Sequence, residues 1–415
     1  MSKKGSPLFT LFFTIFLDMV GVGILLPVMP VLLTDPTSPH YILPFGTSVK
    51  TGYLLLGVLF TLFSLGQFLA APIIGQFSDK WGRKKLLAFS VFGTALGHFL
   101  FAVGIFIGNV PLLFFSRFFA GVTGGNIVVA QAAIADITTP ENRAKNFGLI
   151  GAAFGLGFIL GPFIGGKLTD TTLVSWFSAS TPFLFAALLS LINVVQVLYY
   201  LSETNVHTVK EKKIEWGKSL SNIIHALKMP RVRPLYLTNF IFQAGFSFYM
   251  TFAAVYLLYK FHFTQGELGN YFAFVGIWIV VTQGFITRKV AEYVSEAKVV
   301  QNSVIAVGLC ILAVVLVPTT TLLYAVVPFF AIAVGLSQSN MTALISRSAA
   351  SGVQGEVLGI NGSVMALAQA IPPILSGAAA GLFEPEAPLI IAATLAVIAG
   401  LYFNNHLRNL KLAHS

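Results

Sequence analysis

Charged residues are scarce in this chain. Only 10% of its 415 residues are Asp, Glu, Lys or Arg, whereas soluble domains carry about a quarter. The 25 basic residues give a formal charge of +10, but they are scattered between apolar runs and do not gather on one solvated face, which argues against nucleic-acid binding. Because hydrophobic residues make up 56% of the chain, the composition predicts a protein built for lipid.

Cysteine is almost absent as well. The one cysteine, Cys310, lies inside an apolar run, so no intrachain disulfide can form and the sequence shows no metal-ligand cluster. We expect no metal and no cofactor. We also expect no catalytic residues, so that the chain is not an enzyme.

One short stretch resembles a phosphate-binding loop but lacks its hydroxyl. The residues Gly161 to Leu168 read "GPFIGGKL", and such a loop needs Ser or Thr after its Gly-Lys to hold Mg²⁺. Leu168 stands at that position, and the stretch lies in an apolar run. The sequence therefore contains no nucleotide-binding domain, which argues against an ATP-driven pump.

Long apolar runs dominate what is present. A helix that crosses a membrane needs about 20 mostly apolar residues, and the first run is longer than the core of a signal peptide, so we expect it to be retained. The sequence predicts twelve spans, near residues 8–33, 52–76, 86–107, 111–135, 146–168, 181–202, 234–260, 266–287, 299–317, 321–346, 357–381 and 388–406.

The basic residues fall almost entirely on one side of these spans. If both termini are cytoplasmic, only Lys50, Lys167 and Lys260 lie outside, and Arg117 lies within a span. This asymmetry follows the positive-inside rule. We expect a multi-pass protein of the inner, cytoplasmic membrane with both termini in the cytoplasm.

A single long polar segment divides the chain. It covers residues 203–233 and separates an N-terminal bundle of six helices, 1–202, from a C-terminal bundle of six, 234–415. Within it, apolar residues between Leu220 and Leu227 recur at helical spacing, which suits an amphipathic helix on the inner membrane surface. A solvated charged linker is the alternative.

The two halves echo each other weakly. Asp136 and Arg347 are followed at the same intervals by pairs of glycines, and "GQFSD" at 75–79 has a counterpart in "GFITR" at 284–288. Such symmetry is typical of transporters built from repeats, although chance matching in a glycine-rich chain is the alternative.

Two motifs carry a family resemblance. The loop "GQFSDKWGRKK" at 75–85 is similar to the signature between helices 2 and 3 of the major facilitator superfamily. The fifth span resembles the glycine pattern of its antiporters, at Gly148, Gly157, Gly161, Pro162, Gly165 and Gly166. The N-terminal half looks like the tetracycline-carrier branch of the twelve-span drug:proton antiporters, and the C-terminal half resembles it more loosely. The resemblance implies an all-α membrane protein with twelve transmembrane helices in two pseudo-symmetric six-helix bundles.

The glycine pattern also has a direct physical meaning. Gly157, Gly161 and Gly165 fall four apart and form a flat strip that another helix can approach closely, while Pro162 bends the span. Ordinary tight packing is the alternative. The resemblance implies that this helix packs at the interface between the two halves, where the glycine pattern limits leak through the transporter.

The loop at 75–85 is expected to act as a cytoplasmic latch. The resemblance implies that Asp79 meets the N-terminal end of helix 11, where a helix dipole favours an anion, and that Arg83 meets Asp136. Arg288 and Arg347 occupy the corresponding places in the second half, and we hypothesise acid–base pairing across the halves. A simple positive-inside anchor is the alternative. The latch set is Gly75, Asp79, Gly82, Arg83, Asp136, Arg143, Arg288 and Arg347.

Few ionisable residues lie at mid-membrane. Asp18 and Arg117 are the acid and the base well within spans, and His98 lies at similar depth. Ionisable groups at such depth are costly and usually functional. The resemblance ties the Arg of helix 4 to proton coupling, so we expect Asp18 to carry the proton and Arg117 to tune its charge. The alternatives are a fixed Asp18–Arg117 pair and a His98 that only packs.

The remaining polar and aromatic candidates suit an amphiphilic substrate. The expected cavity residues are Asn126, Asn239, Gln243, Phe246, Gln338 and Asn340. The chain departs from tetracycline carriers in helices 3 and 9, where "LGHF" at 96–99 and "VIAVG" at 304–308 contain no acid. This makes tetracycline itself doubtful as the substrate.

We therefore expect a secondary active transporter that exports a small amphiphilic compound, such as a drug or a metabolite, in exchange for protons. The alternatives are a proton-coupled importer of a metabolite and an exporter of a siderophore-like natural product. The expected partners are the substrate, protons and the lipid bilayer, with no nucleic acid, and we expect a monomer.

Overall fold

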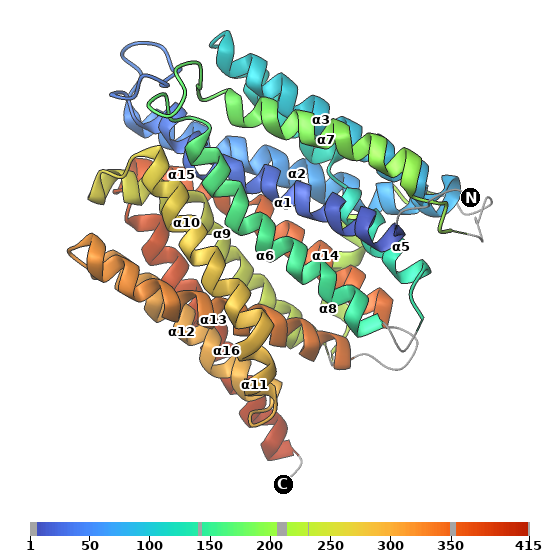
Figure 1. The fold of residues 1–415 in the computed structure, drawn as a ribbon. Helices are drawn as coiled ribbons and strands as arrows, with labels where there is room; N and C mark the ends of the chain where they lie inside the picture. The colour runs from blue at the N-terminus through green and yellow to red at the C-terminus, as the bar shows by residue number, and fades with distance from the viewer. Residues whose placement is uncertain (1–5, 140–142, 206–213, 231, 349–353, 414–415) are drawn as a thin grey trace. The chain divides into compact units, whose positions relative to one another are not determined.

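The computed structural model describes the backbone of residues 6–139, 143–205, 214–230, 232–348 and 354–413. Every regular element in these ranges is a helix, and they contain no strand (Figure 1). The helices are α1 Pro7–Thr34, α2 Val49–Trp81, α3 Arg83–Phe106, α4 Val110–Thr123, α5 Asn126–Asp136, α6 Arg143–Lys167, α7 Thr181–Tyr200, α8 Lys218–Lys228, α9 Arg233–Phe261, α10 Gln265–Val281, η2 Thr282–Ile286, α11 Thr287–Ala291, α12 Glu296–Leu316, α13 Thr320–Arg347, α14 Gln354–Ala370, α15 Pro372–Leu382 and α16 Ala387–Ala413.

Twelve helical stretches of the described chain are long and apolar enough to cross a membrane. This confirms the twelve spans predicted from the sequence. Three of the spans consist of more than one helix: α4 with α5, α10 with η2 and α11, and α14 with α15. The short helix α8 is the element of the linker and is not a span.

The contacts divide the chain into two compact units. Unit 1 comprises residues 1–52, 62–218 and 264–273, and unit 2 comprises residues 53–61, 219–263 and 274–415. Each unit therefore includes a short piece from the other half of the sequence. In unit 2 the first turns of α2 pack on α15, where Gly57 meets the Pro373 carbonyl. In unit 1 the first turns of α10 pack on α6, where Gly269 meets Gly166.

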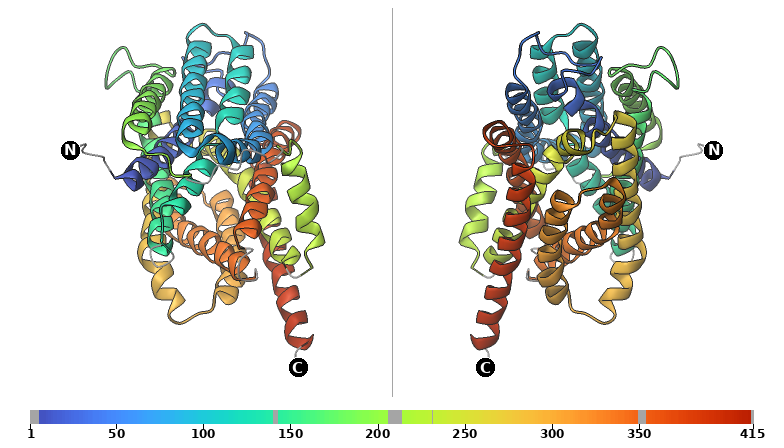
Figure 2. Two further views of the ribbon diagram at one scale, coloured as in Figure 1. Left: turned by 90° about the vertical axis from the view of Figure 1, so that its right-hand side faces the viewer. Right: turned by 90° about the vertical axis from the view of Figure 1, so that its left-hand side faces the viewer.

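Each unit has its own helix pairs. In unit 1, α3 packs against α7 and α1 packs against α6. In unit 2, α16 packs against both α9 and α12 (Figure 2). An apolar core in unit 1 holds α1, α3, α5, α6 and α7 together, and it consists of Leu11, Ile15, Leu87, Ala88, Val91, Val129, Ala130, Ala133, Ile134, Ile150, Ala153, Val197 and Leu201.

The fourth span is broken at Gly124 and Gly125, where the sequence predicted one continuous helix. A break inside a membrane frees carbonyl groups that need new donors, because no water is available there. Ser90 of α3 donates to the Thr123 carbonyl, and Gln67 of α2 donates to the Gly124 carbonyl at 3.2 Å. The break therefore persists because neighbouring side chains satisfy it, and it places Asn126 at the start of α5.

Two further spans are irregular in unit 2. The eighth span contains the π-helical turn η2, whose Thr282 packs against Gly335 of α13. The eleventh span is interrupted between Ala370 and Pro372, because proline removes a backbone donor and clashes with the preceding turn. Such irregular turns are frequently found at functional positions in helices.

The glycine strip of α6 packs against α1 in the same unit. A Cβ atom at Gly161 would lie 2.7 Å from the Val20 carbonyl oxygen and 2.8 Å from the Gly23 Cα. Gly165 meets Ile24 in the same way, and Gly157 meets Met19. The side of α6 that meets α10, from the other half of the sequence, is instead marked by Gly166. The strip thus brings α1, with Asp18, close to α6.

We expect Gly161→Ala to destabilise the protein, because the new methyl group would meet rigid backbone on α1. Overpacking of this kind costs about 1–3 kcal/mol, which a lower melting temperature of the detergent-purified protein would report. Gly359→Ala is the matched control, since a Cβ atom there meets nothing within 4 Å and alanine favours a helix. Equal melting temperatures for the two variants would contradict the close α1–α6 contact.

Candidate functional site

Asp18 lies within α1 in unit 1, where its side chain is half-buried and its Oδ2 atom is buried. The Asn126 side chain is its polar neighbour from the start of α5. Even so, neither Asp18 Oδ2 nor Asn126 Nδ2 has a hydrogen-bond partner within 3.5 Å among the described residues. A carboxyl with one buried oxygen that lacks a donor can accept or release a proton when its surroundings change.

The guanidinium group of Arg117 is buried in the same unit and is held against an aromatic ring. Arg117 is only 4% exposed, and its Cζ atom lies 4.3 Å from the ring centroid of Phe63 on α2. Its Nε atom has no hydrogen-bond partner in the described part of the chain. No salt bridge between described side chains joins Arg117 to Asp18. The fixed Asp18–Arg117 pair, which was one reading of the sequence, is therefore wrong for this structure.

His98 on α3 completes this group of ionisable residues. It is 6% exposed, and its Nε2 atom faces Gly21, one turn along α1 from Asp18. A Cβ atom at residue 21 would lie 2.8 Å from that nitrogen. The charge of Arg117 acts on the His98 ring. His98 thus contacts α1 one turn from Asp18 and is also within reach of the Arg117 charge.

The expected cavity residues fall in different units. Asn126 is in unit 1, whereas Asn239, Gln243 and Phe246 lie on α9 and Gln338 and Asn340 lie on α13 in unit 2. Within unit 2, Asn239 donates to Asn361 Oδ1 of α14 at 2.8 Å. Asn340 donates to the Leu336 carbonyl of its own helix at 2.9 Å.

An aromatic row follows the α9 polar residues. Phe242, Phe246 and Tyr249 stack along α9, with successive ring centroids 6.3 Å apart. Tyr249 also meets Phe330 of α13 at 4.8 Å. Phe242 and Tyr249 are buried, as are the amides of Asn239 and Gln243, so most of this row belongs to the packed interior of unit 2, and Phe246 is its half-buried member.

The latch residues of unit 1 form a three-residue ion cluster. Arg83 at the start of α3 places Nη1 2.6 Å from Asp79 Oδ1 and Nε 3.1 Å from Asp136 Oδ2. One guanidinium thus bridges the ends of α2 and α5. The sequence predicted a contact between Asp79 and the N-terminal end of the eleventh span, which begins with α14. Residues 349–353 and the first side chains of α14 lie outside the described residues, so this prediction stays untested.

Sequence reasoning missed Glu203, which follows the sixth span. Its carboxylate accepts the backbone N–H of Arg83 at 2.8 Å and that of Lys84 at 3.3 Å, so it caps α3. The two residues that follow continue the contact: Thr204 donates to Asp136 Oδ2 at 3.3 Å, and Asn205 donates to the Asp79 carbonyl at 2.9 Å. The signal in the sequence was an acid placed directly after a span, in a loop otherwise rich in bases.

Gly82 has a geometric reason to be glycine in this cluster. Its φ of +96° lies in the left-handed region, which side chains other than glycine rarely adopt. A Cβ atom there would also collide with the Glu203 carboxylate. Gly75, another expected latch residue, leaves room beside Val128 of α5. The structure describes the backbone at Arg143 and Gly148 but not the surroundings of these two residues.

The second half contains its own ion pair. Arg347 Nη1 lies 3.0 Å from Glu296 Oε1, which joins the end of α13 to the start of α12 inside unit 2. The sequence hypothesis had sought the partner of Arg347 in the other half and had overlooked Glu296. Arg288 is exposed on α11.

No group of His, Cys, Asp or Glu in the described part of the chain could hold a metal ion. The ionisable side chains named above are a half-buried carboxyl group, a buried guanidinium and a buried imidazole.

Comparison with known proteins identifies the family. The description "Major Facilitator Superfamily" belongs to the family model that matches residues 11–373. The class H tetracycline resistance protein of Pasteurella multocida is 29% identical over 361 residues, covering 86% of this chain and 85% of that protein. The quinolone resistance protein NorA of Staphylococcus aureus is 28% identical, with 93% and 92% covered.

Solved structures agree on the fold. The human organic anion transporter MFSD10 (TETRAN) superposes with a TM-score of 0.73 at 21% identity, covering 97% of this chain and all of that one. A D-xylose-proton symporter gives a TM-score of 0.76 at 14% identity, with 95% and 96% covered. At such identities the likeness shows the fold alone.

These findings confirm the family, the fold and the transport class that the sequence predicted, and they place the chain with transporters and not with enzymes. The chain belongs to the Major Facilitator Superfamily, as a twelve-span, membrane-embedded secondary transporter.

Proposed function

We propose that the chain exports a small amphiphilic compound across the inner membrane in exchange for protons that bind at Asp18. The observation that carries this proposal is the Oδ2 atom of the half-buried Asp18, which is itself buried, has no hydrogen-bond partner among the described residues and makes no salt bridge to Arg117. A structural carboxylate at this depth would be paired. An unpaired one suits a group that must be loaded with a proton and then emptied.

Arg117 and His98 set the charge around this proton site. With Arg117 close to Asp18 the carboxylate form is favoured, and with Arg117 withdrawn the protonated form is favoured. A change in the position of one buried guanidinium is therefore enough to couple a conformational change to proton release. His98 contributes by packing on α1 beside Gly21, next to Asp18.

The substrate class follows from unit 2. The half-buried Phe246 and Gln338 offer a ring face and an amide to a substrate, and the buried Phe242, Tyr249, Asn239, Gln243 and Asn340 behind them add no charge. Such a lining favours a partly aromatic, amphiphilic compound. Relatives are named for resistance to tetracycline and to quinolones, which makes both drugs suitable test compounds.

The Arg83 cluster acts as the cytoplasmic latch of the transporter. Arg83 binds two carboxylates, at the ends of α2 and α5. Glu203 and the two residues after it form hydrogen bonds to the same helix ends. Opening toward the cytoplasm would require this corner to loosen. The distribution of basic residues supports cytoplasmic termini and a cytoplasmic position for the latch.

The linker between the proposed bundles 1–202 and 234–415 rests on the inner membrane surface. Helix α8 exposes an apolar stripe at Leu220, Ile224 and Leu227, whereas Ala226 on another side of the helix is buried. A helix with one apolar exposed edge and terminal lysines suits the interface of a membrane with anionic lipids.

We expect Asp18→Asn to abolish accumulation driven by a pH gradient, because asparagine cannot carry the proton. The measurement is transport in proteoliposomes with an imposed gradient, using tetracycline, a quinolone and other amphiphilic compounds. Exchange of labelled for unlabelled substrate without a gradient is the control, and it should persist because binding and rocking are intact. Full gradient-driven accumulation by Asp18→Asn would remove Asp18 as the proton carrier.

The same proteoliposomes decide the direction of coupling. Dissipation of an imposed proton gradient by substrate that moves against the proton flow supports antiport. Substrate that enters together with protons would establish the importer alternative and overturn the export proposal.

We expect Asp79→Lys to reduce transport several-fold, because the lysine would repel Arg83 where a carboxylate now lies 2.6 Å away. Initial transport rates, corrected for the amount of protein in the membrane, provide the measurement. Asp170→Lys is the matched control, since Asp170 is on a separate loop after α6 and makes its hydrogen bonds to Thr172. A normal rate for Asp79→Lys would contradict the latch.

Glu203→Ala should destabilise the start of α3, because two N–H groups lose their carboxylate acceptor. Loss of a helix cap costs about 0.5–2 kcal/mol, and we expect a lower melting temperature together with slower transport. Glu203→Gln keeps an acceptor oxygen and should be milder. Glu215→Ala, which removes only a surface pair with Lys218, is the control. A Glu203→Ala protein as stable and as active as this control would show that the cap is dispensable.

A further inference from the structure

The buried charge of Arg117 rests on an aromatic ring. Its Cζ atom lies 4.3 Å from the ring centroid of Phe63, and Nε has no hydrogen-bond partner among the described residues. A cation over a ring face is attracted by the ring quadrupole, and the attraction grows when water is excluded. Arg117 is 4% exposed, so Phe63 supplies an interaction that water supplies elsewhere.

The backbone holds this ring in place. Gly121 of α4, one turn after Arg117, has no side chain and so allows the Phe63 carbonyl of α2 to approach its Cα directly. Gly66 of α2, one turn after Phe63, in turn meets the Phe118 carbonyl at 2.8 Å from an ideal Cβ position. Residues three and four apart share a helix face. The two glycines therefore fix the crossing of α2 and α4 at the level where the ring and the guanidinium meet.

We propose that Phe63 is a positioning residue for proton coupling: its ring holds the Arg117 guanidinium away from the Asp18 carboxyl, which keeps that carboxyl able to bind a proton. This inference rests on the proposed role of Asp18 and assigns Phe63 a part in it. When α2 and α4 shift against each other, the ring leaves the guanidinium. Arg117 then turns to the nearest acid and favours its ionised form.

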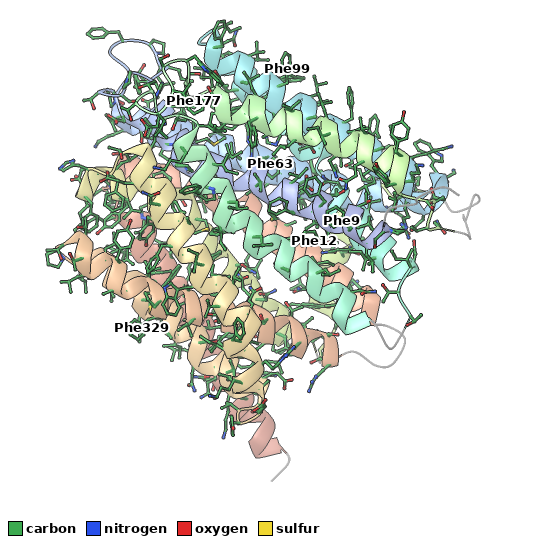
Figure 3. The ribbon with its side chains drawn as sticks, viewed as in Figure 1. Phe9, Phe12, Phe63, Phe99, Phe177 and Phe329 are labelled. Carbon is green, nitrogen blue, oxygen red and sulfur yellow. The ribbon has the colours of Figure 1, made fainter. Side chains whose placement is uncertain are left out.

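The charged groups around this site are few. Arg117 of α4 acts on His98 of α3, His98 contacts α1 one turn from Asp18, and Asn126 of α5 adds a neutral amide beside Asp18. The neighbouring acid Asp79 and the lysines of α2 and α3 lie at the ends of these helices. The competition for the Arg117 charge is thus between one ring and one carboxyl. Figure 3 labels Phe63 among the helices of unit 1 and Phe99 on α3.

The test is an infrared titration of the purified full-length protein, which needs no substrate. The carboxylic-acid stretching band of Asp18 is identified as the band that Asp18→Asn removes. In Phe63→Leu, which keeps an apolar side chain but has no ring face, we expect the midpoint of that band to fall by about one pH unit, a tenfold change in proton affinity. Phe63→Tyr and Phe63→Trp retain a ring and should keep the original midpoint.

Two further variants separate positioning from packing. Phe99→Leu removes a ring of the same size from the exposed side of α3 and should leave the midpoint unchanged. An unchanged midpoint in a folded Phe63→Leu protein would overturn the proposal. So would a shift in Phe63→Tyr as large as that in Phe63→Leu, because either result would mean that the ring face has no effect on the proton affinity of Asp18. If Asp18→Asn removes no titrating band, the proton-carrier role of Asp18 fails first; if the band is present and Phe63→Leu does not move it, only the role of Phe63 fails.

Discussion

The exclusion of water from the membrane interior governs the rest of this structure. Each backbone N–H and C=O within a span must find a partner inside the protein, which is why the described chain is built of helices. The same constraint decides where a helix can break. The fourth span is interrupted at Gly124 only because Ser90 and Gln67 donate to the carbonyl groups that the break leaves free. Asn126 owes its place near Asp18 to this interruption.

Charge within the membrane obeys the same constraint at higher cost. A guanidinium without water needs a partner, and one alternative from the sequence was a fixed pair with the Asp18 carboxylate. The protein uses the face of Phe63 for Arg117 instead, and the Asp18 carboxyl stays without a salt bridge among the described residues. When Arg117 leaves the neutral ring of Phe63, no unpaired charge remains at the ring, whereas the separation of an ion pair would leave a buried carboxylate unpaired. That difference makes the arrangement reversible, which an ion pair of two buried charges would not be.

The sequence predicted what depends on composition and spacing, and it missed what depends on contacts between distant helices. Hydropathy is a local property, so the twelve spans and the depth of Asp18 and Arg117 followed from it. The approach of Phe63 to Arg117 depends on the close crossing of α2 and α4 at Gly66 and Gly121. The local sequence around each of these residues does not predict that crossing. Glu296 was overlooked for a similar reason, because an acid at a helix start is common and its partner Arg347 is far along the chain.

The ion pairs of the two halves have opposite polarity, and the helix dipoles treat them differently. In unit 2 the acid Glu296 begins α12 and the base Arg347 ends α13, so both charges agree with their helix ends. In unit 1 the base Arg83 begins α3 and the acid Asp136 ends α5, so both charges oppose theirs. At the start of α3 the carboxylate of Glu203 supplies the negative charge that the helix dipole favours, and it accepts hydrogen bonds from two backbone N–H groups. The corner in unit 1 therefore holds only while the segment after the sixth span stays in place, whereas the pair in unit 2 needs no such help. A joint that depends on a third segment is the one suited to open during transport.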